Sequence, residues 1–246
     1  GCGTFTQRAT LVAHAVDEYL DPLLRGRDPR NSEDIWQMTR VNAYWRNGPV
    51  LNNALSGVDL ALWDIKGKVA GMPVYDLLGG KCRNGAMVYR HADGRDPQEV
   101  LDNVLAYREQ GILAVRCQMG GYGGRVRDIN RDNATAGKGQ KQATLRMKQM
   151  EQLDSDFPGA YFDPDVYARS IPAMFEHIRE KIGFDLQLLH DIHERLAPID
   201  AIRLAKAVEP YRLFFLEDPL APEETEWFRR LRQQAAVPIA MGELFN

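Results

Sequence analysis

The sequence predicts an α/β fold built on a parallel sheet, and three observations support this prediction. From about residue 85 onward, short apolar segments typical of strands alternate with segments that have helical spacing. The strand segments are apolar at consecutive positions, as expected of a parallel sheet that is buried on both faces. No GxGxxG motif follows the first of them, so a dinucleotide-binding sheet loses support and a barrel is favoured over an open sheet.

The first third of the chain is helical in pattern. Residues 10–24 are apolar at helical spacing, and Ser32 followed by two acidic residues is a typical helix start. Pro49 opens a long helix that ends near Gly71, and its apolar positions surround much of the cylinder. We therefore expect this helix to pack on more than one side, and we expect a short helix at residues 74–78.

The rest of the chain predicts strands and helices in alternation. Strands are expected at residues 86–89, 113–117, 186–189, 213–216 and 239–241. Helices are expected around Val100, Phe175, Ile202 and Phe228. The change of pattern predicts two domains, one over residues 1–84 and one over residues 85–246.

The interval from Gln118 to Val166 interrupts this alternation. It contains four glycines, followed by a polar and basic stretch, and it is longer than an ordinary βα loop. Two interpretations stay open, because long loops in compact domains are either disordered insertions or functional lids. The second interpretation predicts a lid over the mouth of a barrel.

Composition and charge exclude several classes of protein. The 246 residues are 44% hydrophobic and 26% charged, as in an ordinary globular chain, and no apolar run approaches the ~20 residues of a membrane span. The net charge of −3 comes without a basic stripe, so we expect neither nucleic acid nor a membrane as partner. Three cysteines without a CxxC pair fit a reducing, cytoplasmic location.

Carboxylates follow three of the predicted strands. Asp191, Glu217 and Glu243 stand at intervals of 26 residues, so one βα unit separates each from the next. In a parallel barrel they would converge on one face, where their mutual repulsion requires a cation and their hard oxygens suit Mg²⁺. Each could instead be a first-turn acid of the following helix, but the equal spacing favours the metal site. Asp218, which precedes Pro219 in a turn, is interpreted as a structural neighbour.

These stretches resemble the enolase superfamily, and more narrowly its mannonate dehydratase family of starvation-sensing-protein-like sugar acid dehydratases. The resemblance rests on residues 43–49, 59–68, 77–82, 89–94, 189–193, 216–218 and 242–246, which read AYWRNGP, DLALWDIKGK, LLGGKC, YRHADG, LHDIH, LED and GELFN. It implies part of an α+β capping domain, here mainly helical, before part of a (β/α)₇β TIM-type barrel that includes its first five strands. It also implies that Asp191, Glu217 and Glu243 bind Mg²⁺, and that the chain covers part of a longer enzyme.

The resemblance implies a reaction as well: Mg²⁺-dependent dehydration of D-mannonate and/or D-gluconate to the 2-keto-3-deoxy acid, through an enediolate that the metal stabilises. Arg116 stands where many superfamily members begin a Lys-x-Lys motif, so a lysine base is excluded there. The family pairs such an arginine with a tyrosine base. Tyr122 is the nearest candidate, with Tyr161 and Tyr167 as further options, and Arg116 would have to lower the phenol pKa from ~10.

Two histidines complete the site that the resemblance implies. His193 resembles the general acid of the family, and His91 matches a histidine that contacts the substrate. Thr6 and Asp93 stand where the family more often has asparagine. Three functions therefore stay open: the sugar acid dehydratase, another acid-sugar dehydratase or epimerase of the superfamily, and a poorly catalytic binding or regulatory homologue. In each case we expect a small sugar acid as ligand and a homo-oligomer.

Overall fold

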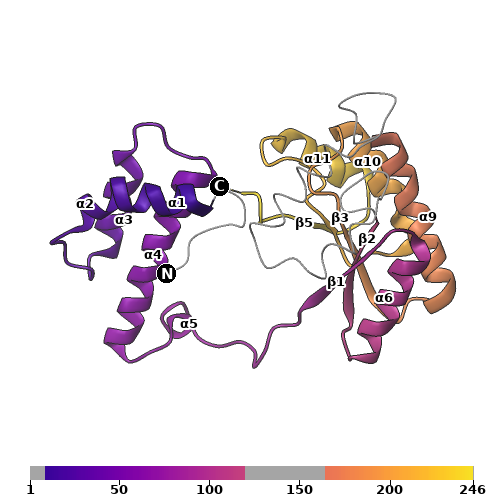
Figure 1. Cartoon of the computed structure of the whole chain (residues 1–246), viewed down its shortest axis with the longest axis horizontal. Coiled ribbons are helices and arrows are strands. Elements are labelled where there is room, and N and C mark those ends of the chain that lie inside the picture. The colour runs from indigo at the N-terminus through magenta and orange to yellow at the C-terminus, as the bar shows by residue number, and fades with distance from the viewer. Residues whose placement is uncertain (1–8, 120–163, 246) are drawn as a thin grey trace. The chain divides into compact units, whose positions relative to one another are not determined.

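A computed structural model describes residues 9–119 and 164–245 (Figure 1). Its contacts divide the chain into two compact units, one that runs to Ala86 and one from Met87 to Phe245. Thr6, Tyr122 and Tyr161, which the sequence singled out, lie outside the described residues. In the described residues, no helix is both long enough and apolar enough to cross a membrane.

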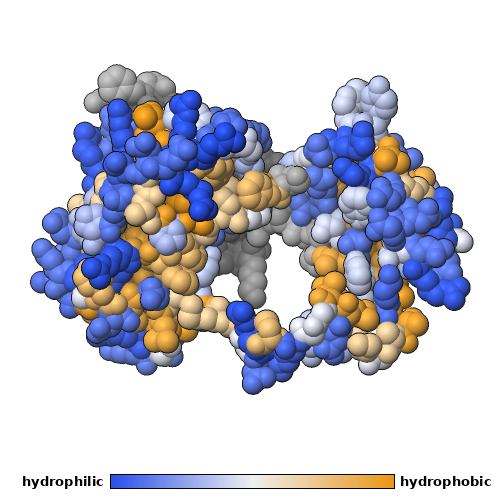
Figure 2. Space-filling view, turned by 180° about the vertical axis from the view of Figure 1, so that it is seen from behind, coloured by the Kyte–Doolittle hydropathy of each residue, from blue (hydrophilic) through white to orange (hydrophobic). Residues whose placement is uncertain are grey.

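The N-terminal unit is made of helices, as its sequence predicts. They are α1 (Ala9–Ala15), the π-helical turn η1 (Val16–Leu20), α2 (Asp21–Leu24), α3 (Ser32–Asn42), α4 (Pro49–Ala70) and α5 (Val74–Leu77). The long helix α4 packs against α1, α3 and α5, which confirms the expected packing on more than one side. Many apolar side chains of this unit stay exposed, among them Leu60 at 50% and Val69 at 74%, and Figure 2 shows apolar surface between its polar side chains.

The ends of α4 follow directly from its sequence. Pro49 occupies the first turn, where a missing N–H costs no hydrogen bond. Gly71 ends the helix in the left-handed region, with φ of 66°, a conformation that glycine adopts without steric cost. The Met72 N–H then donates to the Gly67 carbonyl at 2.9 Å, which closes the last turn.

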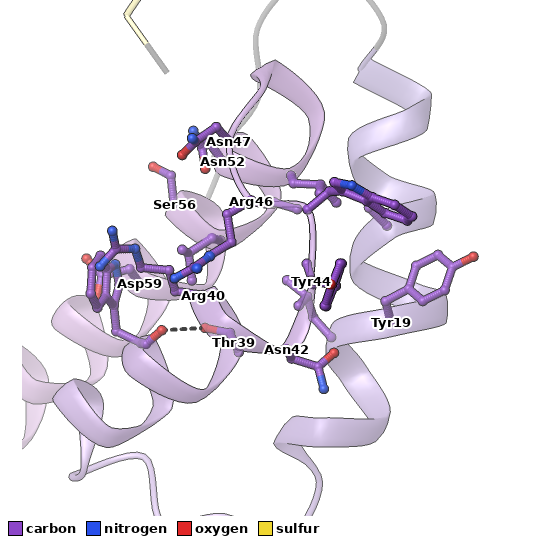
Figure 3. A pocket seen from close by; sticks show the side chains of 18 residues that line it. Tyr19, Thr39, Arg40, Asn42, Tyr44, Arg46, Asn47, Asn52, Ser56 and Asp59 are labelled. Atoms are coloured by element: carbon purple, nitrogen blue, oxygen red, sulfur yellow. Dashed lines mark hydrogen bonds between the residues drawn. The ribbon is translucent and has the colours of Figure 1, made fainter.

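A cavity of about 820 Å³ lies within the N-terminal unit (Figure 3). Its wall combines aromatic side chains such as Tyr19 and Tyr44 with polar ones such as Arg40 and Asp59. The described lining contains one carboxylate, that of Asp59, and no histidine. It therefore offers neither a cluster of metal ligands nor an acid and base pair.

The second unit contains a five-stranded sheet in which every neighbouring pair is parallel. The strands β1 to β5 follow one another across the sheet in chain order, and they are Tyr89–Gly94, Ala114–Met119, Gln187–Asp191, Leu216–Glu217 and Ile239–Ala240. Helices alternate with them as α6 (Pro97–Glu109), α9 (Pro164–Ile182), α10 (Pro198–Ala207), the 3₁₀ turn η2 (Glu209–Tyr211) and α11 (Thr225–Gln234). The sequential order confirms the α/β prediction and is consistent with part of a TIM-type barrel.

The main core lies between this sheet and its helices. Strand residues such as Val115, Cys117 and Leu188 are fully buried there, together with Phe175 and Ile178 of α9. Because side chains alternate along a strand, the residues between these positions face the opposite side of the sheet. That opposite side carries the polar residues described below.

Two predicted boundaries are corrected by the structure. The first strand was expected at residues 86–89 but runs from Tyr89 to Gly94, and Met87 and Val88 are more than 60% exposed. The long interval is also shorter than expected at both ends, because Gln118 belongs to β2 and Val166 to α9. The rest of the predicted lid, residues 120–163, lies outside the described residues.

The junction from β1 to α6 is tightly packed and has a hydrogen-bonded helix cap. Asp96 accepts a hydrogen bond from the Glu99 N–H at 2.9 Å, and the Glu99 carboxylate accepts one from the Arg95 N–H at 2.8 Å. This capping arrangement satisfies N–H groups that the first helical turn leaves without partners. Gly94 has no room for a side chain, since a Cβ there would lie 2.6 Å from the Val100 nitrogen.

Candidate functional site

The polar face of the sheet in the second unit collects most of the predicted site residues. Arg116 on β2 lies in register with His91 on β1, and Gln118 lies in register with Asp93. Cys117 between them faces the helices as part of the core. The alternation of β2 therefore directs Arg116 and Gln118 toward the same side.

Arg116 joins two of these strands by ion pairs. Its Nη1 lies 3.2 Å from Oδ2 of Asp191, and its Nη2 lies 3.4 Å from Oδ1 of Asp93. The side chains of Arg116 and Asp191 are 8% and 3% exposed, so the pair is shielded from water. A buried pair of this kind holds both groups in place, because removal of one leaves the other as an uncompensated charge.

Asp191 and Glu217 are the last residues of β3 and β4, and Glu243 follows β5 by three positions. The prediction that they stand at the carboxyl ends of neighbouring parallel strands is therefore confirmed. Glu217 accepts a hydrogen bond from the Tyr89 hydroxyl, which lies 3.3 and 3.2 Å from its two oxygens. Burial and then the Glu217 carboxylate raise the pKa of Tyr89 to about 12, so the phenol stays protonated as the donor.

Asp218, which its sequence context predicts to be a structural neighbour, lies inside the cluster of acidic residues. It is fully buried, and neither carboxylate oxygen has a hydrogen-bond partner in the described part of the chain. Burial, followed by the charges of Asp191 and Glu217, raises its pKa to about 7. A buried carboxylate without a partner is costly, and nearby cations are the usual compensation.

The carboxylates and His193 form two overlapping sets of possible metal ligands. Ligand atoms of Asp191, His193 and Asp218 lie within 4.8 Å of one another, and so do those of Glu217, Asp218 and Glu243. Asp218 belongs to both sets, whereas the predicted trio is divided between them. Burial, then Asp191, raises the pKa of Glu217, which reports the same crowding of negative charge. The donor set of hard oxygens fits Mg²⁺.

His193 lies at the edge of this cluster. Its Nδ1 is 3.4 Å from Oδ2 of Asp191 and 3.8 Å from Oδ2 of Asp218. The interaction with Asp191 raises the pKa of His193, which favours the protonated ring that a general acid needs.

The backbone is strained at three residues of this region. His193 and Glu194 both have φ of 54°, and Asp218 has φ of 41°. Such backbone strain in non-glycine residues is typical of functional sites.

His91 lies on β1 beside the ring of Tyr89, with the two ring centroids 5.5 Å apart. Burial, and then the charge of Arg116, lower the pKa of His91. The imidazole is therefore kept neutral and can both donate and accept a hydrogen bond. This environment differs from that of His193, whose pKa moves in the opposite direction.

His190 was not singled out from the sequence, and its hydrogen bonds indicate a structural role. Its Nδ1 donates to the Cys117 carbonyl at 2.8 Å, and its Nε2 accepts from the Tyr167 hydroxyl at 2.8 Å. These bonds lie on the helical side of the sheet, where burial lowers the pKa of His190 to about 4. Tyr167 therefore points its hydroxyl to the face opposite Arg116.

Comparison with known proteins gives matches along most of the chain. Residues 1–79 match the N-terminal domain of the mandelate racemase / muconate lactonizing enzyme family, and residues 142–246 match the enolase C-terminal domain-like family. The D-galactonate dehydratase family member RspA of Pantoea ananatis is 58% identical over 245 residues, and the D-mannonate dehydratase of Rhizorhabdus wittichii is 42% identical over 248. Both alignments cover 100% of this chain and 58% of the relative.

A solved structure is similar over the same extent. The crystal structure of an enolase from Pantoea ananatis with bound D-gluconate and Mg aligns with a TM-score of 0.84 and 57% sequence identity. The alignment covers 100% of this chain and 58% of that one. The chain thus spans a little more than half the length of the relatives that it matches.

Proposed function

Because the chain belongs to the enolase superfamily, we propose that it forms part of a Mg²⁺-dependent sugar acid dehydratase. The proposed reaction removes water from D-gluconate and/or D-mannonate and yields the 2-keto-3-deoxy acid. The observation that carries the proposal is the group of carboxylates at the ends of β3 and β4, of which Asp191 and Asp218 are buried and Glu217 is half-buried, flanked by Arg116 and His193. The relatives named for galactonate or mannonate dehydration, and the one with bound D-gluconate and Mg, support a sugar acid as substrate.

The proposed metal ligands are Asp191, Glu217 and Glu243. Their hard oxygens suit Mg²⁺, and the two oxygens of Asp218, which have no hydrogen-bond partner in the described residues, support a cation nearby. When bound, Mg²⁺ would stabilise the negative charge that develops on the substrate carboxylate as the α-proton leaves. Tyr89 supports Glu217 by its hydrogen bond, and Arg116 holds Asp191.

Two further residues would carry out the proton transfers, and two others would assist them. We assign removal of the α-proton to Tyr122, with Arg116 as the cation that would stabilise the phenolate. His193 would protonate the departing 3-hydroxyl, a role supported by its raised pKa. His91 is neutral and lies on β1, next to the strand that carries Arg116. It would bind a substrate hydroxyl.

A binding homologue with little catalysis is the second candidate. Asp93, where the family more often has asparagine, contacts the guanidinium of Arg116 and would compete with a tyrosine phenolate for it. Such a protein would bind a sugar acid with Mg²⁺ and form little product. A cytoplasmic location and a homo-oligomeric state stay predictions.

A screen of aldonic acids tests the proposal. Full-length protein would be incubated with Mg²⁺ and D-gluconate, D-mannonate, D-galactonate or their epimers, and 2-keto acid formation would be followed. The proposal expects 2-keto-3-deoxy acid from D-gluconate or D-mannonate. If only D-galactonate gave product, D-galactonate would replace D-gluconate and D-mannonate as the assigned substrate. Epimerisation without formation of a 2-keto acid would indicate the epimerase alternative.

A further inference from the structure

Gln118 is a buried polar side chain that the proposed chemistry does not use. It is 1% exposed, yet neither its Oε1 nor its Nε2 has a hydrogen-bond partner in the described part of the chain. Buried amides are nearly always hydrogen-bonded, because an unpaired donor or acceptor loses the water that it had in the unfolded chain. An amide with both ends unpaired therefore indicates that something else binds there.

The position of Gln118 places it at the candidate site. It follows Arg116 by two residues on β2, so the alternation of the strand directs both side chains to the polar face. Across the sheet it lies in register with Asp93, whose carboxylate already contacts Arg116. Gln118 therefore lies one step further toward the carboxyl end of β2 than the arginine.

We propose that Gln118 is a specificity-determining residue that binds two neighbouring hydroxyl groups of the sugar acid. The amide presents a donor and an acceptor side by side, and both lack partners. A carboxylate can only accept, and would leave Oε1 unpaired, whereas one hydroxyl can accept from Nε2 while its neighbour donates to Oε1. The match is thus to the polyol part of an aldonate rather than to its acid group. This inference rests on the proposed function.

The test compares two leucine variants in the full-length protein. Gln118→Leu removes both polar groups and keeps a similar volume. Gln187→Leu is the matched control, since Gln187 lies on neighbouring β3, at the exposed end of the strand. For Gln118→Leu we expect kcat/KM and affinity for D-gluconate with Mg²⁺ to fall about 10- to 100-fold, while the control stays near wild type.

Two further measurements separate substrate binding from a structural role. Thermal unfolding of the ligand-free protein should show Gln118→Leu as stable as wild type or more stable, because an unpaired polar group has been removed. Aldonates that lack one hydroxyl should identify the contact: the penalty of Gln118→Leu should shrink for one or two analogues and persist for the others.

Each outcome of these measurements leads to a different conclusion about Gln118. If wild type converts or binds aldonates and Gln118→Leu does so equally well, Gln118 is satisfied by ordered water and the inference is wrong, while the proposed function stands. An equal penalty for every analogue would contradict a hydroxyl contact, and a large drop in ligand-free stability would indicate a structural amide. If wild-type protein neither binds nor converts any aldonate, the proposed function and this inference fail together.

Discussion

Nη1 of Arg116 lies 3.2 Å from Oδ2 of Asp191, in an ion pair that is almost entirely buried. The pair joins β2 to β3 at the centre of the candidate site, where the carboxylates of Glu217 and Asp218 also gather. It fixes the predicted metal ligand Asp191 and leaves the surrounding acids with an excess of negative charge. A divalent cation would balance that charge.

Replacement of Glu217 by glutamine should weaken Mg²⁺ binding by at least about tenfold, because an anionic ligand becomes a neutral one. Calorimetric titration of full-length protein with Mg²⁺ measures the effect. Glu226→Gln is the control, since the Glu226 side chain is 75% exposed on α11. Equal affinity in wild type and Glu217→Gln would remove Glu217 from the metal site.

Metal-free protein should lose stability as pH rises through the range in which Asp218 ionises. The folded-state pKa of Asp218 is about 7 against an ordinary value of 3.8, so the folded protein binds a proton that the unfolded chain has already lost. The contribution of Asp218 to the free energy of unfolding therefore falls between about pH 4 and pH 7 and is constant above that range.

Thermal unfolding in EDTA, compared between wild type and Asp218→Asn, measures this contribution. The variant should gain on wild type as pH rises, and Mg²⁺ should reduce the difference. Asp185→Asn, at an exposed site, should show no such trend. A constant difference between wild type and Asp218→Asn from pH 4 to pH 7 would show that the carboxyl group is not perturbed.

His193→Asn should abolish dehydration while exchange of the substrate α-proton with solvent deuterium continues. The reason is that the proposed acid is lost, whereas the metal ligands and Arg116 stay in place. Proton NMR of D-gluconate in deuterated buffer follows exchange and product together. Dehydration at the wild-type rate in His193→Asn would assign the acid role to another residue.

Gly94→Ala should destabilise the second unit by about 1–3 kcal/mol, the usual range for an overpacked site. A Cβ at this position would lie 2.6 Å from the Val100 nitrogen, so β1 and α6 would have to move apart. Urea unfolding measures the change. Gly85→Ala is the control, because a Cβ there meets nothing within 4 Å, and a similar loss in both variants would contradict the close approach.

Much of the fold could be predicted because its signals are local. Pro49 and Gly71 bound the long helix as expected, and the strands β2 to β5 fall within a few residues of their predicted positions. The first strand was shifted because its apolar neighbours Met87 and Val88 dominate the pattern. The observed strand carries polar His91 and Asp93 on the same face of the sheet as Arg116 and Gln118, so its hydrophobic signal is weak.

The positions of the acidic residues at the strand ends could be predicted from the sequence, whereas the burial of their neighbours could not. Asp191 and Glu217 stand at ends of apolar strands, which is visible in the sequence. Asp218 looked like a turn residue, and its burial became visible only with the neighbouring strands in place. The alternation from Arg116 could have pointed to Gln118, but an amide without partners is a property of three-dimensional packing.

The central claim, that these carboxylates hold Mg²⁺ for a sugar acid dehydration, is tested most directly by product analysis. Full-length protein would be incubated with D-gluconate and with D-mannonate, once with Mg²⁺ and once with excess EDTA, and the products identified by NMR. We predict 2-keto-3-deoxy acid from at least one of the two in Mg²⁺, and none in EDTA. Equal conversion in EDTA, or unchanged substrate in both conditions, would contradict the claim.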